Sequence, residues 1–182
     1  MERLFSIETP RLILSELEED DKTSVFELFS NSRVLEFYDL KAFCSLEDAQ
    51  ALIEKMHLKW EKCIGFRHAI RLKTDRAMIG TCGVNSIQQV DNELAVVIGY
   101  ELHPNAWGAG YMQEALTGLI QYLKQEGLFG NKIKYIWAEI FNQNTKSRQV
   151  VDKLGFELIG TTVNHTNNTL SDNLLKLKLK LY

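Results

Sequence analysis

The chain has 182 residues, of which 45% are hydrophobic and 25% charged, and its formal net charge at pH 7 is −3. This length and composition suit one domain with a hydrophobic core, so we expect a single domain over residues 1–182 and exclude a disordered or fibrous protein. The slightly acidic balance argues against general binding to nucleic acids or anionic membranes. No apolar run approaches the roughly 20 residues of a membrane helix, and the N-terminus lacks the apolar core of a signal peptide.

The three cysteines, Cys44, Cys63 and Cys82, are widely spaced and match neither a disulfide framework nor a metal-ligand pattern. We therefore expect a cytoplasmic protein with reduced cysteines and no metal site. Cys82 falls in an expected strand, where a free cysteine usually behaves as a small apolar residue.

The first third of the chain predicts one strand and two helices. Alternating apolar residues over 11–17 predict the strand, and helical spacing over 20–30, after acidic residues, predicts the first helix. The segment 45–48 has the pattern of a capping box and opens the second helix, which we expect to end at Gly65.

Three strand-like runs follow, at 66–72, 78–87 and 93–102. Short polar breaks at 73–76 and 88–92 separate them. Consecutive strands joined by short turns predict an antiparallel meander.

The clearest helical periodicity in the chain covers residues 111–126, directly after a glycine-containing loop at 104–110. A strand at 135–140 comes next. The strand at 93–102, this helix and the strand at 135–140 form a β-α-β crossover, so the two strands should be parallel neighbours.

The C-terminal part predicts a helix over 145–154 that Gly155 ends, a strand over 156–163 and a final strand over 175–181. In the final strand leucines alternate with Lys176, Lys178 and Lys180, which we interpret as the solvent face of an edge strand. The element order predicts a mixed α/β fold. Its central sheet is twisted and mostly antiparallel with one parallel strand pair, and helices cover both faces.

A strand, a glycine loop and a helix follow one another between Ile98 and Met112. A helix N-terminus offers unpaired N–H groups, and glycine lets the backbone approach a phosphate closely, so this arrangement suits a pyrophosphate. The loop matches neither the Walker A motif nor the complete dinucleotide fingerprint. An ordinary strand-to-helix turn is the alternative interpretation.

The loop resembles motif A of the GNAT superfamily of N-acetyltransferases, Arg/Gln-x-x-Gly-x-Gly/Ala after a strand that ends in apolar-x-Pro. The segment 102–104 supplies the lead-in, and Trp107, Gly110 and Met112 stand at the Arg/Gln, fixed glycine and Gly/Ala positions. Tryptophan there, followed by Gly-x-Gly-Tyr and then Glu114 and alanine, is similar to the ribosomal-protein N-terminal acetyltransferase (RimJ/RimL-like) branch.

The resemblance covers nearly the whole chain. Further segments match the family's motifs in order, at 9–14, 46–49, 79–83, 142–147, 153–156 and 171–172. Ser15 stands where the family frequently has arginine.

This resemblance implies an enzyme that transfers an acetyl group from acetyl-CoA to a primary amine by direct attack in a ternary complex. The acceptor would be a protein N-terminal amine or a small-molecule amine, and Glu36 and Asp39 slightly favour a cationic one. A non-catalytic acyl-CoA-binding sensor on the same fold is the alternative. An RNA-binding module is disfavoured by the net charge, and a monomer or a homodimer is expected.

The resemblance also implies the residues that bind the cofactor. The pyrophosphate would lie on the backbone N–H groups of Gly108, Ala109, Gly110, Tyr111 and Met112, beside Trp107. The acetyl carbonyl would lie near the N–H of Leu102, where the strand at 93–102 splays from its parallel neighbour and admits the pantetheine arm. Asn144 would hydrogen-bond that arm, or cap the helix that follows it.

For catalysis, many family members use a tyrosine seven residues after that asparagine, but here the position is Val151. Ser147 is the alternative acid, unless it is an ordinary helix serine. The related branch often has glutamate at the position of Val97, and Glu101 lies four residues on, on the same face of the strand. Glu101 is thus the candidate base, with a structural carboxylate or a water relay as alternatives.

Other aromatic and titratable residues permit two interpretations. Phe37, Tyr38 and Trp60 either wall the acceptor pocket or belong to the core. His103 follows the strand near the expected cofactor, where it is either catalytic or a solvent-exposed loop residue.

Overall fold

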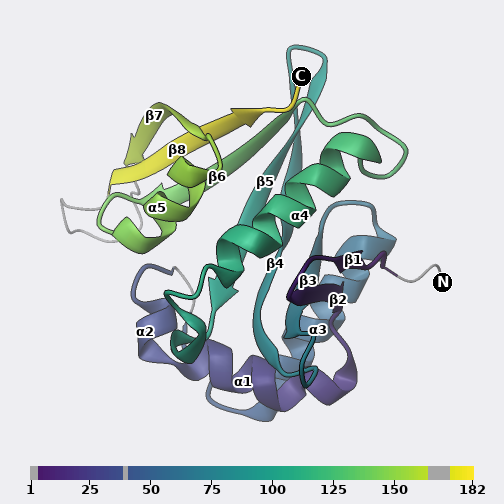
Figure 1. Ribbon diagram of the computed structural model, residues 1–182, viewed down its shortest axis with the longest axis vertical. Coiled ribbons are helices and arrows are strands. Elements are labelled where there is room, and N and C mark those ends of the chain that lie inside the picture. Colours follow the sequence, from purple (N-terminus) through teal and green to yellow (C-terminus); the bar gives the residue numbers. More distant parts are fainter. Residues whose placement is uncertain (1–3, 39–40, 164–172) are drawn as a thin grey trace.

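One sheet of eight strands organises the computed structural model, which describes residues 4–38, 41–163 and 173–182 (Figure 1). The strands are β1 (Ile7–Glu8), β2 (Leu12–Glu16), β3 (Phe66–Leu72), β4 (Met78–Val90), β5 (Glu93–Leu102), β6 (Tyr135–Phe141), β7 (Glu157–Val163) and β8 (Asn173–Lys180). They lie in the order β1-β2-β3-β4-β5-β6-β8-β7. Asp39 and the matched segment 171–172 lie outside the described residues.

Five α-helices are present in the part of the chain that the structure describes. They are α1 (Lys22–Ser30), α2 (Ser32–Leu35), α3 (Leu46–Glu61), α4 (Tyr111–Gln125) and α5 (Thr145–Lys153), with 3-10 turns η1 (Glu19–Asp21) and η2 (Pro104–Ala106). Within that same part, no helix is long and apolar enough to cross a membrane.

The strand pairing is antiparallel except between β5 and β6, where Ala95 to Ile98 pair in parallel with Tyr135 to Ala138. Helix α4 makes the crossover between these two strands. The predicted mixed α/β fold, with its single parallel pair, is confirmed.

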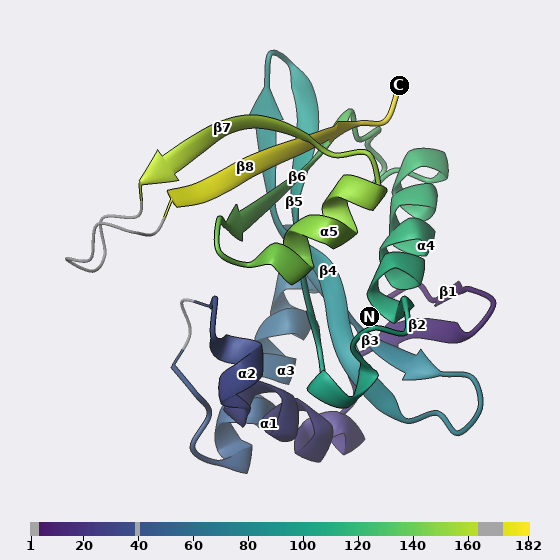
Figure 2. The ribbon, with the colours of Figure 1, turned by 60° about the vertical axis from the view of Figure 1, so that its left-hand side comes forward.

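Helices cover both faces of the sheet, as neighbouring residues of β3 show. Ala69 packs into a cluster with α1 and α3, whereas the next residue, Ile70, packs into the larger cluster that contains the buried face of α4. Successive side chains of a strand point to opposite faces, so the two clusters lie on either side of the sheet. Figure 2 shows α4 and α1–α3 on opposite sides of β4.

Two predicted boundaries were wrong. The capping box of Ser45 and Asp48 does open α3, but the helix ends at Glu61, because the chain turns at Cys63 with φ of 53° before it reaches Gly65. Strand β4 runs to Val90, well into the predicted break. The hairpin turns over Asp91 and Asn92 alone. Their φ angles of 51° and 65° are both positive, as a two-residue type I′ turn requires.

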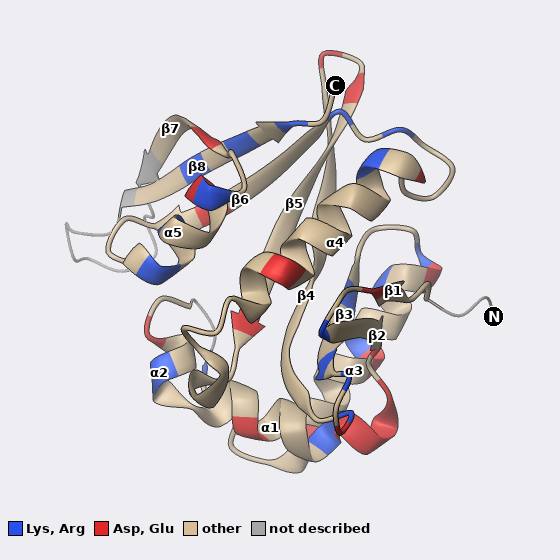
Figure 3. Ribbon diagram, viewed as in Figure 1, with Lys and Arg blue, Asp and Glu red and all other residues tan. Residues whose placement is uncertain are grey.

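The lysine-bearing strand is not an edge strand, so that prediction was also wrong. Strand β8 lies between β6 and β7, and β7 forms the edge. Lys176 and Lys178 lie over aromatic rings of β6, 4.0 Å from the centroid of Trp137 and 5.1 Å from that of Tyr135. The basic residues along β8 are blue in Figure 3.

Candidate functional site

A cavity of about 760 Å³ opens where β5 and β6 separate. Their pairing stops at Ile98 and Ala138, while β5 continues to Leu102. The walls come from α2 and the residues after it, the end of β5, the glycine loop with the start of α4, and one side of α5 along its length. All the predicted site residues except Ala109 line this cavity: Glu101, Leu102, Trp107, Gly108, Gly110, Tyr111, Met112, Asn144 and Ser147.

The glycine loop ends in the N-terminus of α4. Gly108 and Gly110 both have φ of 79°, a left-handed conformation that glycine adopts without steric cost, and Gly110 is the N-cap of the helix. The first N–H groups of a helix have no partner within it and carry the positive end of the helix dipole. The loop and helix therefore offer the cavity an anion-binding surface.

Leu102 presents its backbone to the gap between β5 and β6. It lies opposite Gly80 of β4, and the N–H of His103 donates to Ile79 O at 2.8 Å. This pattern marks Leu102 and Gly80 as a pair without mutual hydrogen bonds, so the N–H and C=O of Leu102 point away from β4. The carbonyl accepts from Trp107 Nε1 at 2.7 Å. The N–H on the same strand edge is positioned to donate to an oxyanion in the cavity.

Two cations flank Trp107 across the cavity. Lys146 Nζ, from α5, lies 3.8 Å from the indole ring centroid, and the guanidinium carbon of Arg33, from α2, lies 4.9 Å from it. Lys153 also lines the cavity. The motif's Arg/Gln position thus holds an aromatic ring that gathers cations from other elements. Arg33 and Lys146 were not predicted as site residues, because tertiary packing alone brings them to the loop.

Ser147 and Asn144 lie together at the start of α5. Asn144 caps the helix, with its Oδ1 accepting from Ser147 N at 3.1 Å, so only its NH₂ group is left to donate to a ligand. Tyr100 donates its hydroxyl to Ser147 O at 3.2 Å, and burial raises the pKa of this phenol. Val151, where many family members have tyrosine, is buried in the core.

Tyr100 is a potential proton donor that sequence analysis missed. Its ring comes from β5 instead of α5. The available signal was strand alternation, which puts Tyr100 on the same face of β5 as Leu102.

Glu101 belongs to a buried network and is not an isolated carboxylate. Its Oε2 accepts from Arg67 Nη1 at 2.5 Å and from Thr81 Oγ1 at 2.6 Å, and its Oε1 accepts from the Tyr38 hydroxyl at 2.5 Å. Glu101 and Arg67 are 5% and 6% exposed, so their opposite charges compensate each other in the interior.

Gly99 allows this network to cross the strand. Arg67 Nη2 donates to Asn85 Oδ1 at 2.5 Å, and a Cβ at position 99 would lie 2.8 Å from that nitrogen and 2.5 Å from Asn85 Nδ2. Any larger residue at position 99 would displace the two side chains.

The remaining predicted side chains separate into wall and core. Phe37, Tyr38 and the exposed Glu36 line the cavity, and Tyr38 also packs against Phe29 of the α1–α3 cluster. Burial, followed by the nearby charge of Glu101, raises the pKa of Tyr38. Trp60 instead packs in the core, where its ring contacts those of Phe5, Phe66 and Phe129.

His103 lines a separate cavity of about 370 Å³, and its Nδ1 accepts from Asn105 N. Among the described residues, no group of three or more His, Cys, Asp or Glu side chains is arranged to hold a metal ion.

The chain matches the acetyltransferase (GNAT) domain family model over residues 11–157. YoaA of Bacillus subtilis strain 168, named an uncharacterised N-acetyltransferase, is 29% identical over 154 residues, which cover 85% of this chain and 84% of YoaA. An acetyltransferase of the GNAT family from Bacillus anthracis has a TM-score of 0.81 at 21% identity, with 97% of this chain and 99% of that chain covered. RimL, a ribosomal L7/L12 alpha-N-protein acetyltransferase solved with coenzyme A, has a TM-score of 0.84 at 19% identity, with 97% and 98% covered.

Proposed function

Because the chain belongs to the GNAT acetyltransferase family, we propose that it transfers the acetyl group of acetyl-CoA to a primary amine by direct attack in a ternary complex. One observation carries the proposal. A single cavity joins a glycine loop at a helix N-terminus to a strand edge beyond the last β5–β6 pair, where the Leu102 N–H has no strand partner among the described residues. The first feature suits a pyrophosphate and the second a thioester carbonyl.

In this proposal acetyl-CoA lies along the cavity. Its pyrophosphate receives hydrogen bonds from the loop Gly108–Met112, and the pantetheine arm enters the gap between β5 and β6 as an extra strand would. The NH₂ group of Asn144 donates to that arm. Arg33, Lys146 and Lys153 give the cavity the positive charge that the phosphates need. The RimL structure, described as a complex with coenzyme A, supports this cofactor.

The proposed reaction forms one C–N bond and breaks one C–S bond. The neutral amine attacks the thioester carbonyl carbon, and the Leu102 N–H stabilises the oxyanion. The C–S bond then breaks, and the leaving thiolate takes a proton from the Ser147 hydroxyl, which regains a proton from solvent in the open cavity. The proton removed from the amine leaves to solvent, so both groups return to their starting state. The attacking nitrogen loses one proton, so the products are an amide and the free thiol of CoA. Holding both substrates in one cavity supplies much of the rate enhancement.

We assign Glu101 an indirect part in removing the amine proton. Both of its oxygens already accept hydrogen bonds, and Tyr38, which also lines the cavity, donates its hydroxyl to Glu101 Oε1. The phenol oxygen accepts the amine proton as the phenol's own proton moves to Glu101. Since Arg67 compensates the charge of Glu101, this carboxylate offers little attraction to a polyamine. That favours an acceptor with a single amine, such as a protein N-terminus.

The test is release of CoA thiol from acetyl-CoA in the presence of single amines: peptides with different first residues, amino acids, polyamines and aminoglycosides. We expect amine-dependent release, and intersecting initial-velocity lines when both substrates are varied. Parallel lines would indicate an acetyl-enzyme instead of direct attack. Acetyl-CoA binding without release for any amine would indicate the sensor, and no binding would overturn both functions. The cytoplasmic location and the oligomeric state stay predictions.

A further inference from the structure

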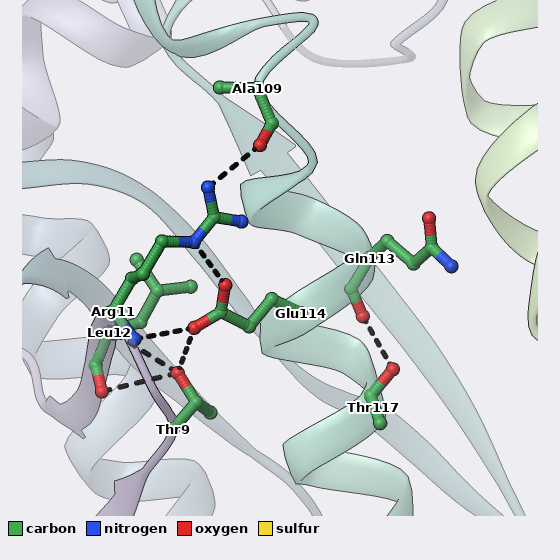
Figure 4. A network of polar contacts seen from close by, with 7 residues as sticks. All are labelled: Thr9, Arg11, Leu12, Ala109, Gln113, Glu114 and Thr117. Carbon is green, nitrogen blue, oxygen red and sulfur yellow. Dashed lines mark hydrogen bonds and ion pairs between the residues drawn. The ribbon is translucent and has the colours of Figure 1, made fainter.

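The N-terminal segment is tied to the cofactor loop by three side chains that the proposed reaction does not use (Figure 4). Glu114, in the first turn of α4, accepts from Thr9 Oγ1 at 2.6 Å, from the backbone N–H of Arg11 at 2.7 Å and from Arg11 Nε at 2.6 Å. Arg11 in turn donates from Nη1 to Ala109 O at 3.0 Å, and its guanidinium carbon lies 4.5 Å from the ring centroid of Tyr111.

The contact with Ala109 fixes the direction of one loop peptide. In a trans peptide the C=O and the following N–H point in opposite directions. The Ala109 carbonyl faces Arg11, so the N–H of Gly110 faces away from Arg11. Gly110 lines the cavity while Ala109 does not, and the N–H of Gly110 therefore points to the cavity side of the loop.

The ion pair of Arg11 and Glu114 also sets the net charge near the N-terminus of α4. A carboxylate in the first turn of α4 lies close to the surface that would receive a pyrophosphate, and like charges repel. Burial opposes ionisation of Glu114, but its hydrogen bonds to Thr9 and Arg11 lower its pKa below the ordinary value. Figure 4 shows the Glu114 carboxylate facing Arg11 and Thr9. The guanidinium of Arg11 compensates the negative charge.

We propose that Arg11 and Glu114 are positioning residues for acetyl-CoA, which aim the Gly110 N–H at the pyrophosphate and cancel the negative charge beside it. The inference rests on the proposed function, because it takes acetyl-CoA as the ligand. Glu114 holds Arg11 in place, and Arg11 holds the loop. Neither side chain needs to contact the reacting atoms.

The test compares Arg11→Gln with the wild type in coenzyme A binding by calorimetry, and in the KM for acetyl-CoA and kcat. Loss of a charge-assisted hydrogen bond beside an anion should weaken CoA binding and raise KM by about tenfold or more. The kcat at saturating acetyl-CoA should stay within about twofold, since the lost interaction exists before and during the transition state. Arg11→Lys keeps the positive charge but cannot donate to Glu114 and Ala109 at once as the guanidinium does. Its affinity for CoA should therefore lie between those of the wild type and Arg11→Gln.

A matched control is Arg71→Gln, which breaks the pair of hydrogen bonds from Arg71 to Asp21, both 2.6 Å, outside the cavity. It should lower stability without changing CoA affinity. The double variant Arg11→Gln/Glu114→Gln removes the repelling charge as well, so it should bind CoA more tightly than Arg11→Gln alone.

The outcomes separate the two proposals. A wild-type protein that does not bind CoA would refute the proposed function. If the wild type binds CoA and folded Arg11→Gln and Arg11→Lys bind it equally well, the pair is structural only and the inference is overturned. A double variant weaker than Arg11→Gln would refute charge compensation.

Discussion

The indole N–H of Trp107 donates to the carbonyl oxygen of Leu102 at 2.7 Å, which ties the glycine loop to the last residue of β5. The N–H of Leu102 lies on the same strand edge as this carbonyl. The bond therefore links the proposed oxyanion donor to the proposed pyrophosphate loop. It fixes the relative positions of the two ends of the cofactor site before any ligand binds.

Trp107→Phe should remove this bond while keeping an aromatic face for Lys146. We expect kcat to fall about threefold to tenfold, less than the 10²–10³ lost when an oxyanion donor is itself removed. The control is Trp137→Phe, because the buried Trp137 Nε1 has no hydrogen-bond partner among the described residues. Equal kcat in the two variants would show that the indole bond does not position Leu102.

Gly108 allows a charge test of the loop. Asn and Asp are the non-glycine residues best tolerated at positive φ, and a Cβ here would meet no described atom within 4 Å. Gly108→Asp should weaken CoA binding by about tenfold relative to Gly108→Asn, which carries the same strain without charge. The same change at Gly110 should weaken CoA binding less, because its Cβ would lie 3.7 Å from Arg11 Nη2, which would compensate the aspartate charge. Equal CoA affinity of the two Gly108 variants would place the pyrophosphate elsewhere.

Ser147→Ala should lower kcat on the order of tenfold or more, with little change in CoA affinity, because a leaving-group acid acts in the transition state. Tyr100→Phe is the competing variant. If the Tyr100 phenol supplies the proton, Tyr100→Phe will lower kcat more than Ser147→Ala does. Thr117→Ala, which removes a hydroxyl that bonds to Gln113 O within α4 at 2.8 Å, controls for loss of a helix hydroxyl. Turnover unchanged in Ser147→Ala would remove that residue from the mechanism.

Tyr38→Phe tests the proton route without breaking the buried ion pair. Glu101→Gln would leave Arg67 buried and unpaired, which typically costs about 3–5 kcal/mol of stability and obscures any kinetic effect. With an aliphatic amine of pKa near 10, we expect Tyr38→Phe to lower the rate at pH 7 and shift the pH–rate profile upward. An α-amine with a pKa near 8 is partly neutral already, so its rate should change less. Superimposed profiles for both amines would assign the base to solvent.

His68 makes stability depend on pH. It is fully buried, and burial lowers its pKa from 6.5 to about 4. In the unfolded chain the His68 imidazole binds a proton below pH 6.5, whereas in the folded chain it binds one only near pH 4. The free energy of unfolding is therefore unaffected by this group above pH 6.5, and it falls by about 3 kcal/mol between pH 6.5 and pH 4. Urea unfolding of the wild type and His68→Gln at pH 7 and pH 4.5 measures it. We expect the stability difference between them to shrink at low pH, and a constant difference would contradict the assignment.

Sequence patterns predicted most elements because hydrophobic period, caps and turns are local. The crossover rule then paired β5 with β6 correctly. The lysines of β8 show the limit, since alternation tells which face of a strand is apolar but not which strands lie beside it. For the site, motif spacing predicted contiguous loop residues, and the structure places all of them except Ala109 on one cavity. Tyr100 beside Ser147 and Arg33 beside Trp107 went unpredicted, because packing between distant segments decides such pairs.

The network around Glu101 has a consequence for how such an enzyme diverges. Its carboxylate binds Tyr38, Thr81 and Arg67 at once, and Gly99 leaves just enough room for Arg67 and Asn85. Removing Glu101 or Arg67 alone leaves the other charge buried and unpaired, so changes at this ion pair must come as coupled substitutions. New acceptor preferences are reached more readily through the exposed Glu36, which lines the cavity outside this ion pair, because a substitution there leaves no buried charge unpaired.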